Sequence, residues 1–327
     1  MSGKIIEIST NSGHLDGILS IAEQHDAEVI SILEFQKQQN RVAVRIYSSE
    51  NSVQTVLDSI QTLLPDEADS TLLLLPVDAR VGDSAELVTE KVEQVAATRE
   101  ELFTEINKGT DCDLNFVLLA ILSTLVAAIG LAENNVAVVI GAMVIAPLLG
   151  PNLGLALGAA LGDKELIKKA LFTNFIGVTL TIGLAMILVI FWQPDMHSQE
   201  LLSRTEVQLS SVVIALAAGI AAVQSLTTRL ANLLVGVMVA VALVPPATVL
   251  GMMIGLQEWS YASGAALLLL VNIAAVNLSA QIVFLLRGIR PRTWIERREA
   301  QQATWINITI WMILLGLCVL LIVYIAK

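Results

Sequence analysis

The sequence NNVAVVIGAMVIAPLLGP, from Asn134 to Pro151, has a counterpart in NLLVGVMVAVALVPPATV, from Asn232 to Val249. Both stretches are apolar and interrupted by proline, and three landmark pairs are each 98 residues apart: Asn134 and Asn232, Pro147 and Pro245, Asn174 and Asn272. Each stretch belongs to a unit of three long apolar segments. Because three is an odd number, a second copy that follows directly must enter the membrane from the opposite side. The pattern therefore predicts an inverted repeat, which is typical of transporters.

Apolar residues dominate the chain. Hydrophobic types make up 55% and charged types only 15% of its 327 residues, which excludes a purely soluble protein. Seven apolar segments follow Asp113, each of roughly the 20 residues that a helix needs to cross hydrocarbon. They are Leu114–Ala132, Val136–Leu161, Leu171–Trp192, Val212–Leu230, Leu233–Leu256, Ala262–Leu286 and Thr304–Ile325. We predict an all-α membrane domain over residues 114–327, with repeat 1 at 114–192, repeat 2 at 212–286 and a final helix at 304–325.

The charges divide the chain into two parts. Residues 1–113 carry 21 acidic and 8 basic side chains, whereas residues 114–327 carry 9 acidic and 11 basic ones. An acidic domain repels phosphate groups, so nucleic acid is excluded as a partner. The N-terminus lacks the apolar core of a signal peptide, and Lys and Arg gather in the loops after the second and sixth apolar segments. This bias predicts a cytoplasmic N-terminus and a C-terminus on the outer side of the membrane.

Residues 1–80 are expected to form a small α+β domain. The patterns predict strands at Lys4–Ser9, Glu28–Phe35, Arg41–Ser48 and from Thr71, and helices at Ser12–His25 and Glu50–Leu64. The order βαββαβ predicts a ferredoxin-like sandwich, with two helices on one face of an antiparallel sheet. Such a domain can sense a small molecule, or it can be a purely structural or oligomerising module.

The tripeptide Ser12-Gly13-His14 follows the first strand of this domain. A helix N-terminus there offers unpaired N–H groups to an anion, which makes the tripeptide the expected ligand-facing loop of a sensing domain. The alternative, which we favour, is a plain helix cap by Asn11 or Ser12. Further along, residues 81–113 predict an amphipathic connecting helix. It either couples the two domains or packs against its copies in an oligomer.

The proline breaks define the expected substrate path. Proline removes an N–H donor, and freed carbonyls are tolerated in a membrane mainly where protein or water meets them. Paired breaks in two halves point to a substrate site, and the alternative is a pair of simple kinks packed against neighbouring helices. The candidate path residues are Asn134, Asn135, Pro147, Gly150, Pro151, Asn174, Asn232, Pro245, Pro246 and Asn272.

The polar side chains near these breaks are amides rather than charges, and Gln224, Asn277 and Gln281 belong to the same set. Hydrogen-bonded amides hold membrane helices together, and the alternative is a site for a neutral or zwitterionic solute. No Asp or Glu lies inside an apolar segment, which disfavours a carboxylate-based proton pump. Glu133 is the candidate for a coupling carboxylate, although a Glu at this depth can simply reach the interface.

The stretch ENNVAVVIGAMVIAPLLGPNLGLALGAALGD, from Glu133 to Asp163, resembles a family of prokaryotic uncharacterised hydrophobic membrane proteins, domain of unknown function 389. The similarity extends through the Pro245-Pro246 segment and covers most of the membrane part. The resemblance implies a multi-pass protein of the prokaryotic inner membrane. It brings no substrate, reaction or functional residue.

Two function hypotheses follow. The first is a transporter or channel for a small solute or ion, with a path between the repeats and a regulatory cytoplasmic domain. The second is an oligomeric sensor or scaffold whose cytoplasmic domain binds a ligand or partner without transport. An enzyme is not expected, because the sequence has no GxSxG, HExxH or nucleotide-binding motif and no metal-ligand spacing of Cys and His. We expect no metal or cofactor, the lipid bilayer as surroundings, and a homo-oligomer.

Overall fold

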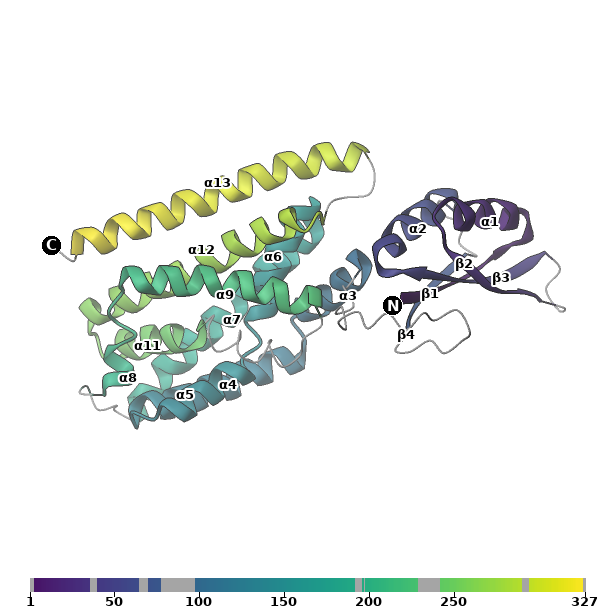
Figure 1. Ribbon diagram of the computed structural model, residues 1–327. Coiled ribbons are helices and arrows are strands. Elements are labelled where there is room, and N and C mark those ends of the chain that lie inside the picture. Colours follow the sequence, from purple (N-terminus) through teal and green to yellow (C-terminus); the bar gives the residue numbers. More distant parts are fainter. Residues whose placement is uncertain are drawn as a thin grey trace, which may run out of the picture. The chain divides into compact units, whose positions relative to one another are not determined.

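The computed structural model describes residues 3–35, 40–64, 70–77, 98–191, 196, 198–228, 242–289 and 294–325 (Figure 1). The chain separates into two compact units. The first is formed mainly by the N-terminal 99 residues and the second by most of the remainder. The first contains a sheet and the second is helical (Figure 1).

The N-terminal unit is a four-stranded antiparallel sheet with two helices on one face (Figure 1). Its elements are β1 (Gly3–Asn11), η1 (Ser12–His14), α1 (Leu15–Gln24), β2 (Glu28–Glu34), β3 (Arg41–Ser49), α2 (Glu50–Leu63) and β4 (Thr71–Val77). The strands lie in the order β2-β3-β1-β4. The predicted succession of strands and helices is therefore confirmed. Pro76 lies in β4, at an edge of the sheet, where a missing N–H donor is tolerated.

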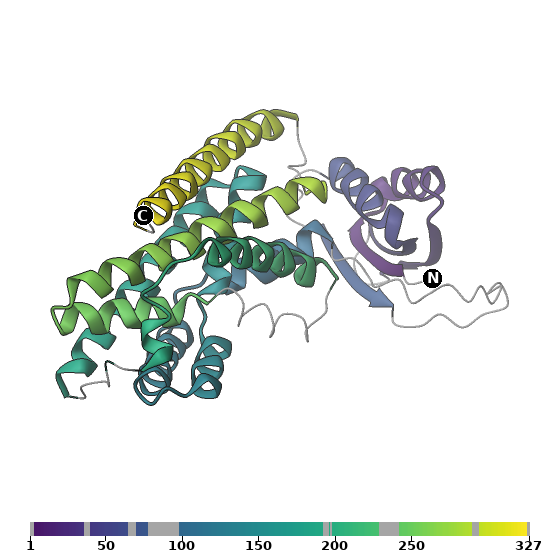
Figure 2. The same cartoon turned by 60° about the vertical axis from the view of Figure 1, so that its left-hand side comes forward.

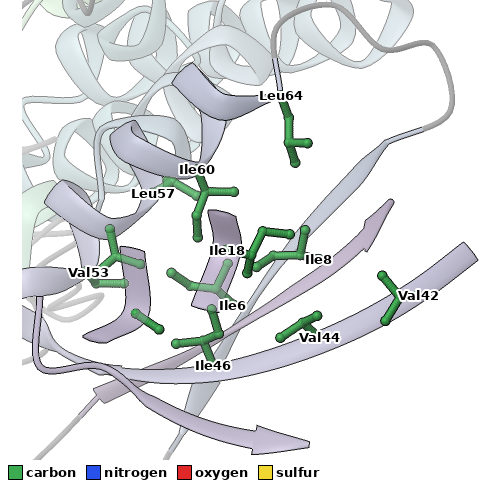
Figure 3. Packing of buried hydrophobic residues seen from close by; sticks show 12 residues of the cluster. Ile6, Ile8, Ile18, Val42, Val44, Ile46, Val53, Leu57, Ile60 and Leu64 are labelled. Atoms are coloured by element: carbon green, nitrogen blue, oxygen red, sulfur yellow. The ribbon is translucent and has the colours of Figure 1, made fainter. Parts of the chain in front are cut away.

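The core of this unit lies between the sheet and the helices (Figure 3). Alternate residues of a strand point to one face, so Ile6 and Ile8 of β1 pack beside Val44 and Ile46 of β3. The helices add residues at helical spacing, namely Ile18 and Ala22 of α1 and Val53, Val56, Leu57 and Ile60 of α2. On the opposite face, Arg45 and Glu7 form an ion pair at 2.6 Å. Leu73 and Leu75 of β4 stay 48% and 43% exposed.

The loop after β1 is capped by Asn11. Its Oδ1 accepts a hydrogen bond from the backbone N–H of Gly13 at 3.0 Å, which stabilises the start of the helical segment. The helix-cap interpretation of this loop is thus confirmed, with Asn11 rather than Ser12 as the cap.

Replacing Asn11 with alanine is expected to destabilise the N-terminal unit by about 1 kcal/mol, because the N–H of Gly13 loses its acceptor. Ser12→Ala is the matched control, since the side chain of Ser12 is exposed, and it should be nearly neutral. Thermal unfolding of the full-length variants measures both effects. A larger loss of stability for Ser12→Ala than for Asn11→Ala would show that Asn11 is not the cap.

The second unit consists of helices throughout its described residues. They are α3 (Arg99–Gly109), α4 (Leu114–Ala132), α5 (Val136–Ile145), α6 (Leu149–Leu161), α7 (Lys164–Phe191), α8 (Gln199–Leu202), α9 (Leu209–Thr228), α11 (Val244–Gly255), α12 (Trp259–Leu286) and α13 (Trp294–Ile325). The predicted connecting helix over residues 81–113 is described only from residue 98, where α3 covers its last part.

Five of these helices, α4, α7, α9, α12 and α13, are long and apolar enough to cross a membrane, and the bent pair α5–α6 raises the number to six. The predicted total of seven is therefore not reached among the described residues. The fifth predicted segment, Leu233–Leu256, begins outside them, and α11 alone has 12 residues, or about 18 Å of helix. Large apolar side chains such as Phe172, Phe175 and Ile190 are exposed, as expected of surfaces that face lipid.

Helix α12 is the centre of this unit. In its most apolar stretch 78% of the residues are buried, against 22–44% in the other four spans. Helices α6, α11 and α13 all pack on it, and α12 and α13 run side by side (Figures 1 and 2). Helix α7 packs on α4, α6 and α11. Helices α6 and α11 therefore both contact α7 and α12.

Close helix contacts depend on glycine. Gly251 and Gly255 of α11, four residues apart, lie directly against the backbone carbonyls of Ile182 and Met186 in α7. Gly150 of α6 lies against the backbone of Gly109, at the end of α3. Small residues at this spacing let two helix backbones approach closely, which is common between helices in membranes.

Candidate functional site

The first helix break lies between α5 and α6, which are bent by 48° relative to each other. Ala146 is extended (φ −65°, ψ 128°), as is usual for a residue before proline. Pro147 and Pro151 carry no N–H, so the carbonyls of Met143 and Pro147 cannot receive the usual helical hydrogen bond from them. Pro151 is buried in the first turn of α6. The break predicted from the prolines is confirmed.

Asn152, one residue after Pro151, connects this break to two other helices. Its side chain is fully buried, and its Nδ2 donates to the carbonyl of Leu148 at 2.8 Å. Its Oδ1 accepts two hydrogen bonds, from Nδ2 of Asn174 in α7 at 3.1 Å and from Nδ2 of Asn277 in α12 at 2.8 Å. We call these three residues, Asn152, Asn174 and Asn277, the amide centre.

The second predicted break, at Pro245 and Pro246, falls at the start of α11. Ala242 has a left-handed backbone (φ 40°), and Pro245 and Pro246 occupy the first turn of the helix, where proline is tolerated. The carbonyl of Ala242 accepts a hydrogen bond from Nδ2 of Asn272 in α12 at 3.0 Å. The chain before Ala242, including Asn232, lies outside the described residues.

Both breaks are thus connected to the middle of α12. Asn272 lies at the centre of this 28-residue helix and contacts the second break, whereas Asn277 contacts the residue that holds the first. The two asparagines are five residues apart, or about 7.5 Å along the helix axis. Asn174 and Asn272 are equivalent in the predicted repeat, and each is linked to a backbone carbonyl at one break. Asn272 donates directly to the carbonyl of Ala242, whereas Asn174 donates to Asn152, which in turn donates to the carbonyl of Leu148.

The structure does not bring Asn134, Asn135 or Glu133 to this site. They lie in the turn between α4 and α5, about 15 Å of helix from the first break. Oδ1 of Asn134 accepts from the N–H of Glu200 at 3.0 Å, and Oδ1 of Asn135 caps α5 through the N–H of Val138 at 3.3 Å. All three residues are exposed. The ten residues of α5 therefore separate them from the first break, and their role as path or coupling residues stays a prediction.

Gly150 makes a close packing contact. It lies beside Gly109, where a side chain would overlap the backbone. The neighbouring turn of α3 is held on α7 by Thr173, whose hydroxyl donates to the carbonyl of Thr110 at 2.8 Å. Lys169 strengthens the same contact with an ion pair to Asp111 at 2.7 Å.

The site has polar atoms but no charge. Helices α6, α11 and α12 contain no Asp or Glu, and no cluster of three His, Cys, Asp or Glu occurs in the described part of the chain. Four buried oxygens of α7, α11 and α12 have no hydrogen-bond partner: Oδ1 of Asn174, Oδ1 of Asn277, Oγ1 of Thr248 and Oε1 of Gln281. The site can therefore offer acceptors to a small bound species, but it has no general acid or base.

Asn152 is the residue that the sequence reasoning missed. It is the only polar side chain between Val136 and Leu161, and this isolation was a usable signal. The repeat concealed it, because the equivalent position in the second half is Leu250, which is apolar. Asn277 and Gln281 were noticed as amides, but nothing in the sequence distinguished them from structural ones.

Comparison with known proteins adds a family but no activity. The profile of a family described as "Domain of unknown function (DUF389)" matches residues 143–278, which include both breaks. An uncharacterized protein of Methanocaldococcus jannaschii is 36% identical to the chain over 235 residues, which is 72% of this chain and 73% of that protein. No solved structure matches the chain significantly.

Proposed function

The chain belongs to the DUF389 family of unknown function, and we propose that it is a multi-pass inner-membrane transporter or channel for a small solute or ion. The observation that carries the proposal is the convergence of the bend between α5 and α6 and of the proline start of α11 on the middle of one buried helix, through Asn277 and Asn272. Broken helices that meet at mid-membrane are the usual place for substrate or ion sites in transporters.

The helix contacts support an inverted repeat over residues 114–192 and 212–286. Helix α6 packs on α7 in the first half, and α11 packs on α12 in the second. The same broken helices also cross over, since α6 packs on α12 and α11 packs on α7. This exchange is what two repeats related by a pseudo-two-fold axis produce. In such architectures one repeat moves against the other to open the path.

We assign the N-terminal unit to the ferredoxin-like class and give it a regulatory role on the cytoplasmic side. The strand order β2-β3-β1-β4, with both helices on one face, supports that class. The basic residues in the first turns of α7 and just after α12 support a cytoplasmic N-terminus and an outer C-terminus. We also propose a homo-oligomer.

Flux into proteoliposomes tests the transport function. In the double variant Pro147→Ala and Pro246→Ala each helix regains an N–H donor and can straighten, so we expect flux to fall by about tenfold or more. The panel of solutes to be tested is Na⁺, Rb⁺, neutral amino acids and polyols, and the uptake of each is measured in wild type and variants. Pro76→Ala, at the sheet edge of the N-terminal unit, is the matched control and should leave flux unchanged. Unchanged flux in the double variant would remove the breaks from the path.

A second candidate function is that of a sensor or scaffold without transport. It is favoured by the exposed Leu73 and Leu75 of β4, which alternate with the core-facing Leu72 and Leu74 and so lie on the sheet face away from the helices. Exposed apolar side chains on a sheet face are typical of partner surfaces. This function predicts a ligand or partner for the N-terminal unit and no flux for any member of the panel.

A further inference from the structure

The hydrogen bonds of the amide centre fix which atom of each amide is free. Asn152 must present its Nδ2 to the carbonyl of Leu148, which can only accept. Its Oδ1 then faces Asn174 and Asn277, so both of those residues must present Nδ2 to it. The carbonyl of Ile273, at 2.9 Å from Nδ2 of Asn277, fixes that amide independently.

The two atoms that remain are therefore both oxygens. Oδ1 of Asn174 and Oδ1 of Asn277 are buried without a hydrogen-bond partner, and the whole side chain of Asn277 is inaccessible to solvent. A buried polar atom without a partner is costly, so such atoms are usually filled by water, an ion or a ligand. Both amides donate to the same oxygen of Asn152, so each free oxygen lies on an amide group that contacts that atom.

An acceptor-only region selects its occupant by charge. An anion would meet oxygens and is excluded, whereas a cation or a hydrogen-bond donor is favoured. No carboxylate lies in α6 or α12, and the one in α7, Glu165, is about 13.5 Å along the helix from Asn174. Divalent cations in proteins depend on carboxylates. Neutral carbonyl and amide oxygens suit a singly charged ion, as in channel filters. The end of α5 and the start of α6 meet at the same break, so their opposite helix dipoles offset each other there.

We propose that the amide centre binds a dehydrated monovalent metal cation, such as Na⁺ or K⁺, between α6, α7 and α12, with Oδ1 of Asn174 and Oδ1 of Asn277 as ligands. Pro147 also leaves the carbonyl of Met143, at the end of α5, without its usual helical donor. The role of this cation as substrate or coupling ion rests on the proposed transport function. The binding itself does not require flux.

Ion-dependent thermal stability of the full-length protein in nanodiscs tests the site. A cation that binds only the folded state must stabilise it. Replacing choline with Na⁺ or K⁺ at constant ionic strength should therefore raise the unfolding temperature by about 3 °C or more. Asn174→Leu and Asn277→Leu should abolish this rise. Asn115→Ala, an exposed asparagine at the start of α4, is the control and should retain it.

A second variant keeps the test informative if the leucine variants do not fold. Asn174→Asp adds a negative charge to the ligand set and should lower the cation concentration for half-maximal stabilisation by about tenfold. Equal unfolding temperatures of wild type in Na⁺, K⁺ and choline, as expected if only water fills the centre, would overturn the proposal. Flux without ion-dependent stability would leave transport standing and remove the cation site. Ion-dependent stability without flux would leave the cation site standing and remove the transport function.

Discussion

Replacing Gly251 with leucine is expected to prevent stable folding of the helical unit. A Cβ atom at this position would overlap the carbonyl oxygen of Ile182 and lie 2.8 Å from the Cβ of Ala185, so the two helix backbones would have to separate. Overpacking against backbone cannot be relieved by a change of rotamer, and we expect a loss of at least about 3 kcal/mol. Size-exclusion chromatography and thermal unfolding in detergent measure the fraction that remains folded.

Gly183→Leu is the matched control for this prediction. Gly183 follows Ile182 on α7, but a Cβ there would meet no atom within 4 Å. Leucine forms helix more readily than glycine, so this variant should be neutral or more stable by up to about 1 kcal/mol. If Gly251→Leu were as stable as Gly183→Leu, this result would contradict the close contact between α11 and α7. The contact joins the two proposed repeats, so the result bears on the transport path as well.

Local patterns predicted most of the fold because each follows from one physical rule. Strand alternation located β1 and β3, since burial of Ile6, Ile8 and Val44 requires a period of two. Proline located the bend between α5 and α6, since Pro147 removes a donor wherever it occurs. Hydrophobicity alone placed the start of α7 too late. The helix begins at Lys164 rather than Leu171, because a charged first turn beyond the hydrocarbon costs little.

The polar site was predicted less well, because contacts between distant residues decide it. Asn174 and Asn272 were selected by symmetry and do serve the two breaks. Asn134 shared that symmetry, yet ten helical residues of α5 separate it from the first break. Asn152 had no symmetric partner, and its importance follows only from the approach of α7 and α12 in the folded chain. Sequence spacing measures distance along one helix and not between helices.

Replacing Asn152 with leucine is expected to destabilise the protein by about 2 kcal/mol, because it leaves the Nδ2 donor of Asn174 buried without an acceptor and removes one of the two acceptors of Asn277. The estimate is moderate because single hydrogen bonds between membrane helices average well under 2 kcal/mol. Unfolding in mixed micelles gives the loss, with the exposed Asn115→Ala as a neutral control.

A double-mutant cycle separates the network from simple loss of packing. Once Asn174 is leucine, its stranded donor no longer exists, so Asn152→Leu should then cost about 1 kcal/mol less than in wild type. Additive losses would show that Asn152 and Asn174 act independently and that the first break is held by packing alone. Coupling of the expected size would instead make Asn152 the link through which α7 and α12 both stabilise the bend between α5 and α6, so any movement of either helix would change the hydrogen bonds at that break.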